Sequence, residues 1–129
     1  MILSKLKKVA PVALGLGLLA TNAYAATSAT AYLHAPASSA TSSNEVSING
    51  TVRVVGSNTG YSYNMNAQAV QNLFGPNLVR ASYTVSPRGY ISRVKDVPAS
   101  TYYAQARPSY INHKEGWGYT SGTATISNG

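Results

Sequence analysis

The feature that most constrains this chain is a strict alternation of apolar and polar residues. In residues 46–54 the apolar positions fall on one face together with a glycine: Val46, Ile48, Gly50, Val52 and Val54. Because successive side chains of a β-strand point to opposite faces, this spacing predicts one strand of about ten residues with one buried face. Asn49-Gly50 is also a hairpin signal. A two-residue turn there would mix apolar and polar side chains on each face, so we favour the single strand, with Gly50 as a bulge.

The same alternation recurs along the chain and predicts about seven short strands. The other predicted strands are residues 29–35, 61–69, 79–85, 90–97, 101–107 and 118–127. Turn-forming residues separate several of them, as in Ser86-Pro87-Arg88-Gly89, where proline and glycine suit a type I or II turn. Residues 36–44 (PASSATSSN) are of low complexity and are predicted to form a flexible loop.

Composition and strand spacing together predict the fold class. Beyond residue 25 the chain is poor in Leu, Glu and Lys and rich in Thr, Ser, Val, Tyr, Asn and Gly, which favours strands. About seven strands in roughly 100 residues predict an all-β, immunoglobulin-like antiparallel β-sandwich. A closed barrel or a jelly roll would also fit these strands. Residues 97–106 (VPASTYYAQA) resemble the late strand of many exported sandwiches, in which a Pro-containing turn precedes tyrosines and small inward residues.

The first 25 residues have the three zones of a secretory signal peptide. The basic zone contains Lys5, Lys7 and Lys8. Residues 9–20 form an apolar run that is shorter than the roughly 20 residues a membrane-spanning helix needs. Ala23 and Ala25 are the small residues that precede a cleavage site at Ala26. We therefore expect residues 1–25 to be a cleaved signal peptide, with no integral membrane segment after cleavage.

Cleavage would leave residues 26–129, a length that fits a single β-sandwich domain. The net charge would fall from +7 to +4, because three of the ten basic residues precede the cleavage site and all three acidic residues follow it. The chain has no cysteine, so an exported protein would have to be stable without disulfides, which favours a bacterial source. We expect a secreted or extracellular protein, with the cell surface and the periplasm as the other locations.

The sequence does not predict an enzyme. No G-x-S-x-G elbow places a nucleophilic serine beside a histidine. Glu45, Asp96 and Glu115 are the only acidic residues, too few to favour the paired carboxylates of a glycoside hydrolase. The two histidines, His34 and His113, are 79 positions apart, which is not the spacing of zinc ligands. We therefore predict no catalytic residues, no metal and no cofactor.

The basic residues beyond residue 25 gather in one part of the chain. Five of the seven form a predicted polyanion-binding set: Arg80, Arg88, Arg93, Lys95 and Arg107. Tyrosines are interleaved with them, and arginine beside aromatic rings suits a surface that holds an anionic polymer by charge and stacks on its rings or sugars. Outside a cell the candidates include envelope polymers, acidic polysaccharides, DNA and anionic membrane surfaces. The alternative is that the cations protect strand edges and the tyrosines are ordinary strand residues.

Residues 108–118 (PSYINHKEGWG) form a predicted recognition loop that holds the only tryptophan. Its candidate residues are Tyr110, His113, Lys114 and Trp117. Trp117 lies between two glycines, whose backbone freedom would let the ring reach a sugar or a pocket on a partner protein. In the alternative, Trp117 folds inward as the largest side chain of the core. The exposure of its ring decides between the two.

Three hypotheses for function follow. The first is a small secreted cationic β-sandwich protein with a non-catalytic binding or structural role at the cell envelope or in the extracellular matrix, holding an anionic polymer or a protein partner. The second is a secreted antibacterial protein, since small basic β-sandwich bacteriocins are similar in composition, although no motif links this chain to them. The third is a subunit of a surface fibre or coat that self-associates through strand edges.

Overall fold

A computed structural model describes residues 26–129, and all regular secondary structure in this range is β-strand. The seven longer strands are β1 (Ser28–Leu33), β4 (Thr51–Asn58), β5 (Met65–Gln71), β6 (Leu78–Val85), β7 (Tyr90–Asp96), β8 (Ser100–Pro108) and β11 (Gly122–Asn128). The four short ones are β2 (Ala40–Thr41), β3 (Val46–Ile48), β9 (Ile111–Asn112) and β10 (Trp117–Gly118). The predicted all-β fold is confirmed. The predicted signal peptide lies outside the described residues.

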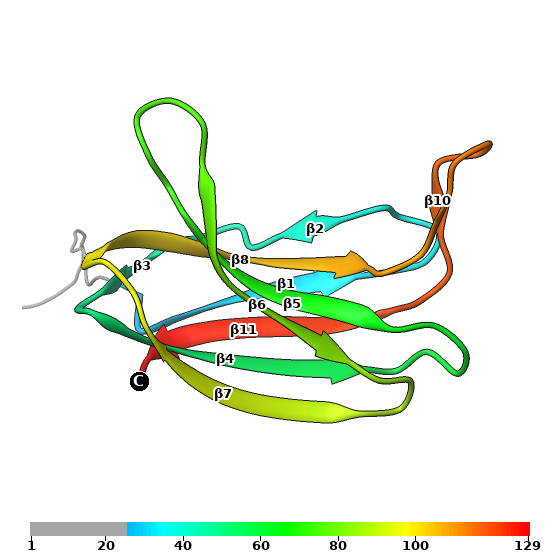
Figure 1. The fold of residues 1–129 in the computed structure, drawn as a ribbon, viewed down its shortest axis with the longest axis horizontal. Helices are drawn as coiled ribbons and strands as arrows, with labels where there is room; N and C mark the ends of the chain where they lie inside the picture. The colour runs from blue at the N-terminus through cyan, green and yellow to red at the C-terminus, as the bar shows by residue number, and fades with distance from the viewer. Residues whose placement is uncertain (1–25) are drawn as a thin grey trace, which may run out of the picture.

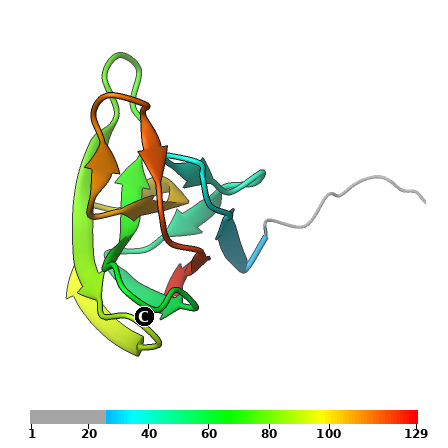
Figure 2. The ribbon, with the colours of Figure 1, turned by 90° about the vertical axis from the view of Figure 1, so that its right-hand side faces the viewer.

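The long strands form two antiparallel sheets (Figure 1). The first sheet has the order β1-β11-β4-β7. The second has the order β2-β8-β5-β6, and β3 pairs with β8 beside β2. β9 and β10 form a separate hairpin that projects from one end of the molecule, and Figure 2 looks onto that end. Among the described residues, no helix is long and apolar enough to cross a membrane.

One hydrophobic core lies between the two sheets. The first sheet contributes Ala29, Ala31, Leu33, Val52, Val54, Ala124 and Ile126. The second contributes Met65, Ala67, Ala69, Ala81, Val85, Tyr102, Ala104 and Ala106. Many of these side chains are alanines, so the sheets approach closely. The sheets are close together at Gly56 in β4, where a Cβ would lie 2.7 Å from Val85 Cγ2 and 2.9 Å from Ala67 Cβ.

The predicted continuous strand over residues 46–54 is wrong. The chain turns at Gly50, where φ is 105°, and passes from one sheet to the other. β3 pairs with β8 in the second sheet, whereas β4 pairs with β11 and β7 in the first, so the alternative hairpin is absent as well. The alternation stays in phase across the turn because Val46 and Ile48 of β3 and Val52 and Val54 of β4 all point into the shared core.

Two other strands begin later than predicted. Tyr61 and Tyr63 lie in the loop before β5, and residues 119–121 lie in the loop before β11. Within the β5–β6 pair the register shifts between Ala69 and Val70, so Arg80 is an extra residue in β6. The two-residue strands β2, β9 and β10 were not predicted as separate strands, because two residues are too few to show alternation. One of them, β2, lies in the segment predicted as a loop.

We predict that Gly56→Ala lowers the free energy of unfolding by about 1–3 kcal/mol, because its methyl group would overlap Val85 and Ala67 across the core. Chemical denaturation would show this as a lower midpoint with an unchanged slope. Ser57→Ala, at the next position in β4, is the matched control and should change stability by less than about 0.5 kcal/mol. Equal losses in the two variants would contradict the close approach of the sheets.

Candidate functional site

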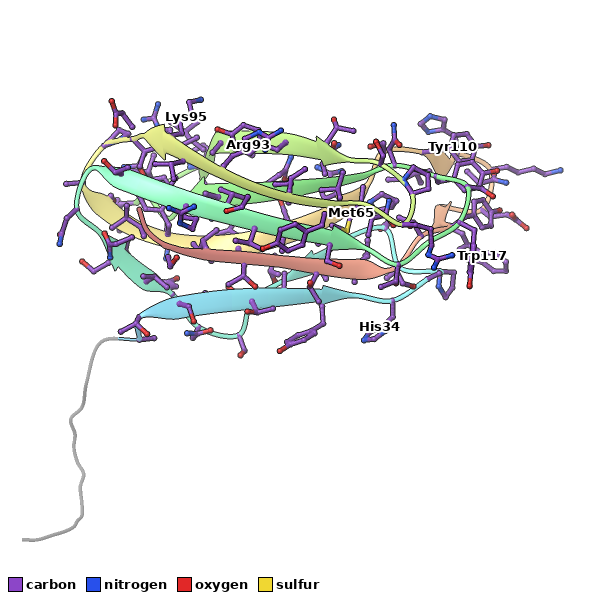
Figure 3. The ribbon with its side chains drawn as sticks, turned by 90° about the horizontal axis from the view of Figure 1, so that it is seen from below. His34, Met65, Arg93, Lys95, Tyr110 and Trp117 are labelled. Atoms are coloured by element: carbon purple, nitrogen blue, oxygen red, sulfur yellow. The ribbon has the colours of Figure 1, made fainter. Side chains whose placement is uncertain are left out.

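Exposed aromatic rings lie at the end of the molecule that carries the β4–β5 loop, the β6–β7 turn and the β9–β10 hairpin, the end seen in Figure 2. We call this surface the aromatic end, and it consists of Tyr61, Tyr63, Tyr110, Trp117 and Tyr119. In Figure 3, Tyr110 and Trp117 both lie at this end. The rings come from segments up to 58 positions apart in sequence, so only the fold brings them together.

Three of the tyrosines form one cluster. The ring centroids of Tyr63 and Tyr110 are 5.3 Å apart, those of Tyr63 and Tyr119 are 5.8 Å apart, and those of Tyr110 and Tyr119 are 6.2 Å apart. These separations are typical of interacting aromatic pairs. Each of the three side chains is nevertheless at least 39% exposed. The rings therefore pack against one another and are still open enough to contact a ligand.

Asn112 shapes the β9–β10 hairpin. Its Oδ1 accepts hydrogen bonds from the backbone N–H groups of Lys114 and Glu115, at 3.0 and 3.2 Å. This is the side-chain turn that asparagine favours. Its Nδ2 donates to Tyr119 Oη at 3.2 Å, which ties the hairpin to the tyrosine cluster. Trp117, on β10, is 48% exposed, so the alternative in which it fills the core is wrong.

A buried amide lies beneath the rings. Asn58, at the end of β4, is 2% exposed. Its Nδ2 donates to the backbone carbonyls of Tyr63 and Val85, at 2.8 and 3.0 Å. Its Oδ1 accepts from Gly60 N at 3.0 Å and from Thr120 Oγ1 at 2.6 Å. Both donor hydrogens and both acceptor positions of the amide are therefore used.

The partners of Asn58 belong to three different connections. Tyr63 lies in the β4–β5 loop, Val85 ends β6, and Thr120 follows Tyr119. The amide thus fixes the position of Tyr63 relative to Tyr119. The sequence does not predict this role of Asn58, because an asparagine before Thr-Gly is an ordinary turn signal.

Arg88 adjoins the aromatic end through the β6–β7 turn. The predicted turn is present, since Gly89 N donates to Ser86 O at 2.8 Å. Arg88 itself has a φ of 59°, a left-handed conformation that is uncommon for residues other than glycine. Its guanidinium carbon lies 4.8 Å from the centre of the Tyr61 ring, within the range of a cation–π contact.

Three of the five predicted polyanion-binding residues lie on a different part of the surface. Arg93 and Lys95 are on the edge strand β7, opposite Val54 and Val52 of β4, so they project from the inner face of the first sheet. In Figure 3 both lie away from the aromatic end. Lys95 Nζ donates to the backbone carbonyl of Arg80 at 2.8 Å, which brings the third residue to this edge. We call these three residues the basic edge.

The basic edge has the features by which sheets avoid pairing with other chains. Inward-pointing cations on an edge strand and a bulge both discourage edge-to-edge association. Arg80, the extra residue of β6, also donates from Nε to Gln71 Oε1 at 2.8 Å. Burial raises the pKa of the nearby Tyr102 phenol, and the positive charge of Arg80 opposes that rise. These contacts give the basic edge a structural explanation.

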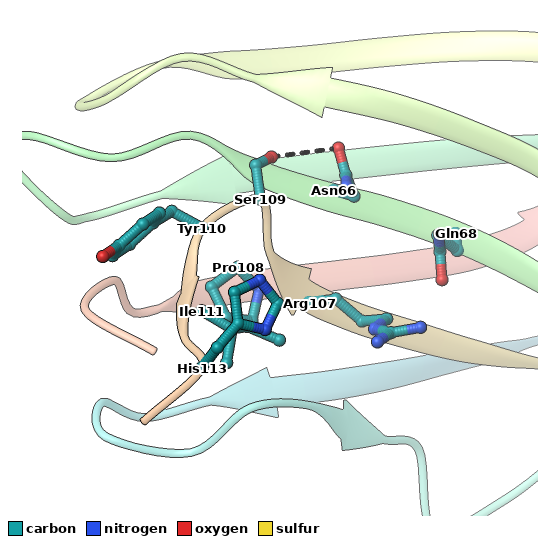
Figure 4. A pocket seen from close by; sticks show the side chains of 8 residues that line it. All are labelled: Asn66, Gln68, Arg107, Pro108, Ser109, Tyr110, Ile111 and His113. Carbon is teal, nitrogen blue, oxygen red and sulfur yellow. Dashed lines mark hydrogen bonds between the residues drawn. The ribbon is translucent and has the colours of Figure 1, made fainter. Parts of the chain in front are cut away.

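Arg107 lies on neither of these surfaces but in a groove on the outer face of the second sheet (Figure 4). The groove has a volume of about 290 Å³. Its lining residues are Asn66, Gln68, Arg107, Pro108, Ser109, Tyr110, Ile111 and His113. Tyr110 belongs to both the groove and the aromatic end, so the two are continuous. Of the five predicted cations, Arg88 and Arg107 therefore adjoin the aromatic rings.

Within residues 26–129 no group of three or more His, Asp or Glu side chains could hold a metal ion. His34 and His113 are both exposed. Comparisons of this chain with protein-family models, with curated proteins and with solved structures give no match.

We predict that Asn58→Asp destabilises the protein by about 3 kcal/mol or more. A carboxylate cannot donate to the carbonyls of Tyr63 and Val85, and it brings a charge into a buried position. Thermal and chemical denaturation would measure the loss. Asn49→Asp is the control, because Asn49 is exposed, and it should be nearly neutral. A neutral result for Asn58→Asp would show that this amide does not hold the loops together.

Proposed function

We propose that residues 26–129 form an exported, non-catalytic domain that binds an anionic polymer of the bacterial cell envelope or extracellular matrix at the aromatic end. The observation that supports this most is the contact of three exposed tyrosine rings, Tyr63, Tyr110 and Tyr119, which come from separate connections. Single exposed aromatic residues are common on protein surfaces, whereas a contiguous group of them marks an interaction site. The strands do not need this group of exposed rings in order to fold, so folding does not explain it.

The chemistry around the rings favours a polymer that is both cyclic and negatively charged. Tyrosine and tryptophan offer flat apolar faces for sugar rings together with hydroxyl or N–H groups for hydrogen bonds. Arg88 and Arg107 adjoin the rings, and Lys114 is exposed on the hairpin beside them. The +4 net charge expected of the exported chain would attract a polyanion over longer distances.

Export and fold class are further parts of the proposal. The charge, apolar run and small residues of residues 1–25 support a cleaved signal peptide. For the fold class we propose an immunoglobulin-like sandwich, supported by Tyr102. Its hydroxyl donates to Pro98 O at 2.7 Å just before β8, a contact like the tyrosine corner of immunoglobulin domains. The placement of β11 between β1 and β4 departs from the immunoglobulin strand order.

We predict that the purified protein sediments with isolated bacterial cell walls and that rising salt weakens the association. The triple variant Arg88→Gln/Arg107→Gln/Lys114→Gln should bind about tenfold more weakly, because its charges adjoin the rings. The matched control is Arg80→Gln/Arg93→Gln/Lys95→Gln, which removes the same charge from the basic edge and should lose about twofold or less.

Equal losses in the two triple variants would indicate binding by net charge alone and contradict a site at the aromatic end. Absence of sedimentation at every salt concentration would contradict the proposed function as a whole. Selective killing of related bacteria by the purified protein would instead indicate the bacteriocin-like hypothesis.

The opposite edge of the first sheet favours a second candidate function, self-association into a fibre or coat. Among the described residues, β1 is hydrogen-bonded to a strand on one side only, β11. Its register with β11 runs unbroken from Ser28 to Leu33, and it carries no charged residue. An uncharged edge strand without a bulge can pair with another chain. The basic edge lacks this property.

We predict for this second candidate that the protein forms large particles as its concentration rises and that Tyr32→Lys prevents this. Tyr32 is an exposed residue of β1, and a lysine on an edge strand opposes pairing. Tyr90→Lys is the matched control, since Tyr90 is equally exposed on β7 at the other edge of the same sheet. Sedimentation velocity would measure the particles, and a monomer at all concentrations would contradict this candidate.

A further inference from the structure

One amide that lines the groove has an unpaired end. Gln68, on the outer face of β5, is 9% exposed. Its Nε2 donates to Ser82 Oγ at 3.1 Å, whereas its Oε1 is buried and has no hydrogen-bond partner. Unpaired buried polar atoms are rare in folded proteins because they cost stability.

The unpaired amide lies across the groove from a cation. Gln68 is on β5 and Arg107 is on the neighbouring strand β8, where Arg107 pairs in register with Asn66. Figure 4 shows the Gln68 side chain directed toward the part of the groove that contains Arg107. On the other side of Arg107, Tyr110 and His113 form the boundary with the aromatic end. Along the groove, a ligand would contact first the Gln68 amide, then the Arg107 cation and then the Tyr110 ring.

We propose that the groove binds one acidic sugar residue, a uronate unit of an anionic polysaccharide. The carboxylate of the sugar pairs with Arg107, and the sugar ring lies against Tyr110. A hydroxyl group displaces the atoms that cover the free end of the Gln68 amide and pairs with it. This proposal rests on the proposed function and specifies its ligand. The groove volume of about 290 Å³ suits a single sugar ring.

The two polar partners together select this ligand class. A hydroxyl group can both donate and accept a hydrogen bond, so it satisfies the Gln68 amide in either orientation. A phosphate polymer without free hydroxyls would pair with Arg107 but could not donate to an amide oxygen. A neutral sugar would satisfy Gln68 but leave Arg107 without an anion. A ligand with both an anionic group and hydroxyl groups uses both residues, and a uronate carries the two on a single ring.

The test measures the affinity of the purified protein for an oligogalacturonate by isothermal titration calorimetry, with a neutral glucose oligosaccharide of equal length and inorganic polyphosphate for comparison. We expect the oligogalacturonate to bind at least about tenfold more tightly than either. Arg107→Gln should lower that affinity by about tenfold or more. Arg53→Gln, a change of the same charge on the outer face of the first sheet, is its control.

Gln68→Met separates a binding role from a structural one. Methionine keeps the length of the side chain but removes the unpaired polar atom, so the melting temperature should rise by about 4 °C. The affinity for oligogalacturonate should fall by about tenfold at the same time. Gln105→Met, at the position opposite Gln68 in β8, is the matched control and should leave the affinity unchanged.

Unchanged oligogalacturonate affinity in Gln68→Met would overturn the proposal, and so would a melting temperature that falls as in a structural defect. Equal binding of the neutral oligosaccharide would overturn the role of the carboxylate, and equal binding of polyphosphate would overturn the role of the sugar. In each of these cases, continued sedimentation with cell walls would leave the proposed function standing. Loss of both activities would overturn the two proposals together.

Discussion

The aromatic end depends on the hydrogen bonds of one buried amide. Asn58 pairs with four groups from three connections, so the loops that carry Tyr63 and Tyr119 are held against the end of β6. A buried amide stabilises a fold only when all of its polar atoms are paired, and Asn58 meets this condition. Below it, the missing side chain at Gly56 allows the two sheets to approach. Above it, the tyrosine rings stack while remaining exposed.

Two of the buried amides among residues 26–129, Asn58 and Gln68, differ in a way that separates structure from function. Asn58 is fully paired and supports the loops. Gln68 has an unpaired end in a groove, where it lowers stability in the absence of a ligand. The edges of the first sheet show a similar contrast. The cations of β7 have a structural explanation, whereas the uncharged β1 does not prevent association with another chain.

Period-two alternation located six of the seven long strands and the first half of β4, because it depends only on which face of a strand is buried. It could not show that the chain changes sheet at Gly50, since β3 and β4 face the same core. It also assigned Tyr61 and Tyr63 to a strand, although they belong to the loop. The site was predictable only in part. Composition indicated arginines near tyrosines, but the separation of Arg107 from Arg93 is set by strand order, and the roles of Asn58 and Gln68 depend on tertiary contacts.

The most direct test of this account is a nuclear magnetic resonance titration of the isotope-labelled protein with purified acidic cell-wall polysaccharide. The account predicts that backbone resonances of Tyr63, Gln68 and Tyr110 shift together, with the same apparent affinity, while those of β1 stay unchanged. Shifts confined to Arg93 and Lys95 would place binding on the basic edge and contradict a site built from the aromatic end and its groove.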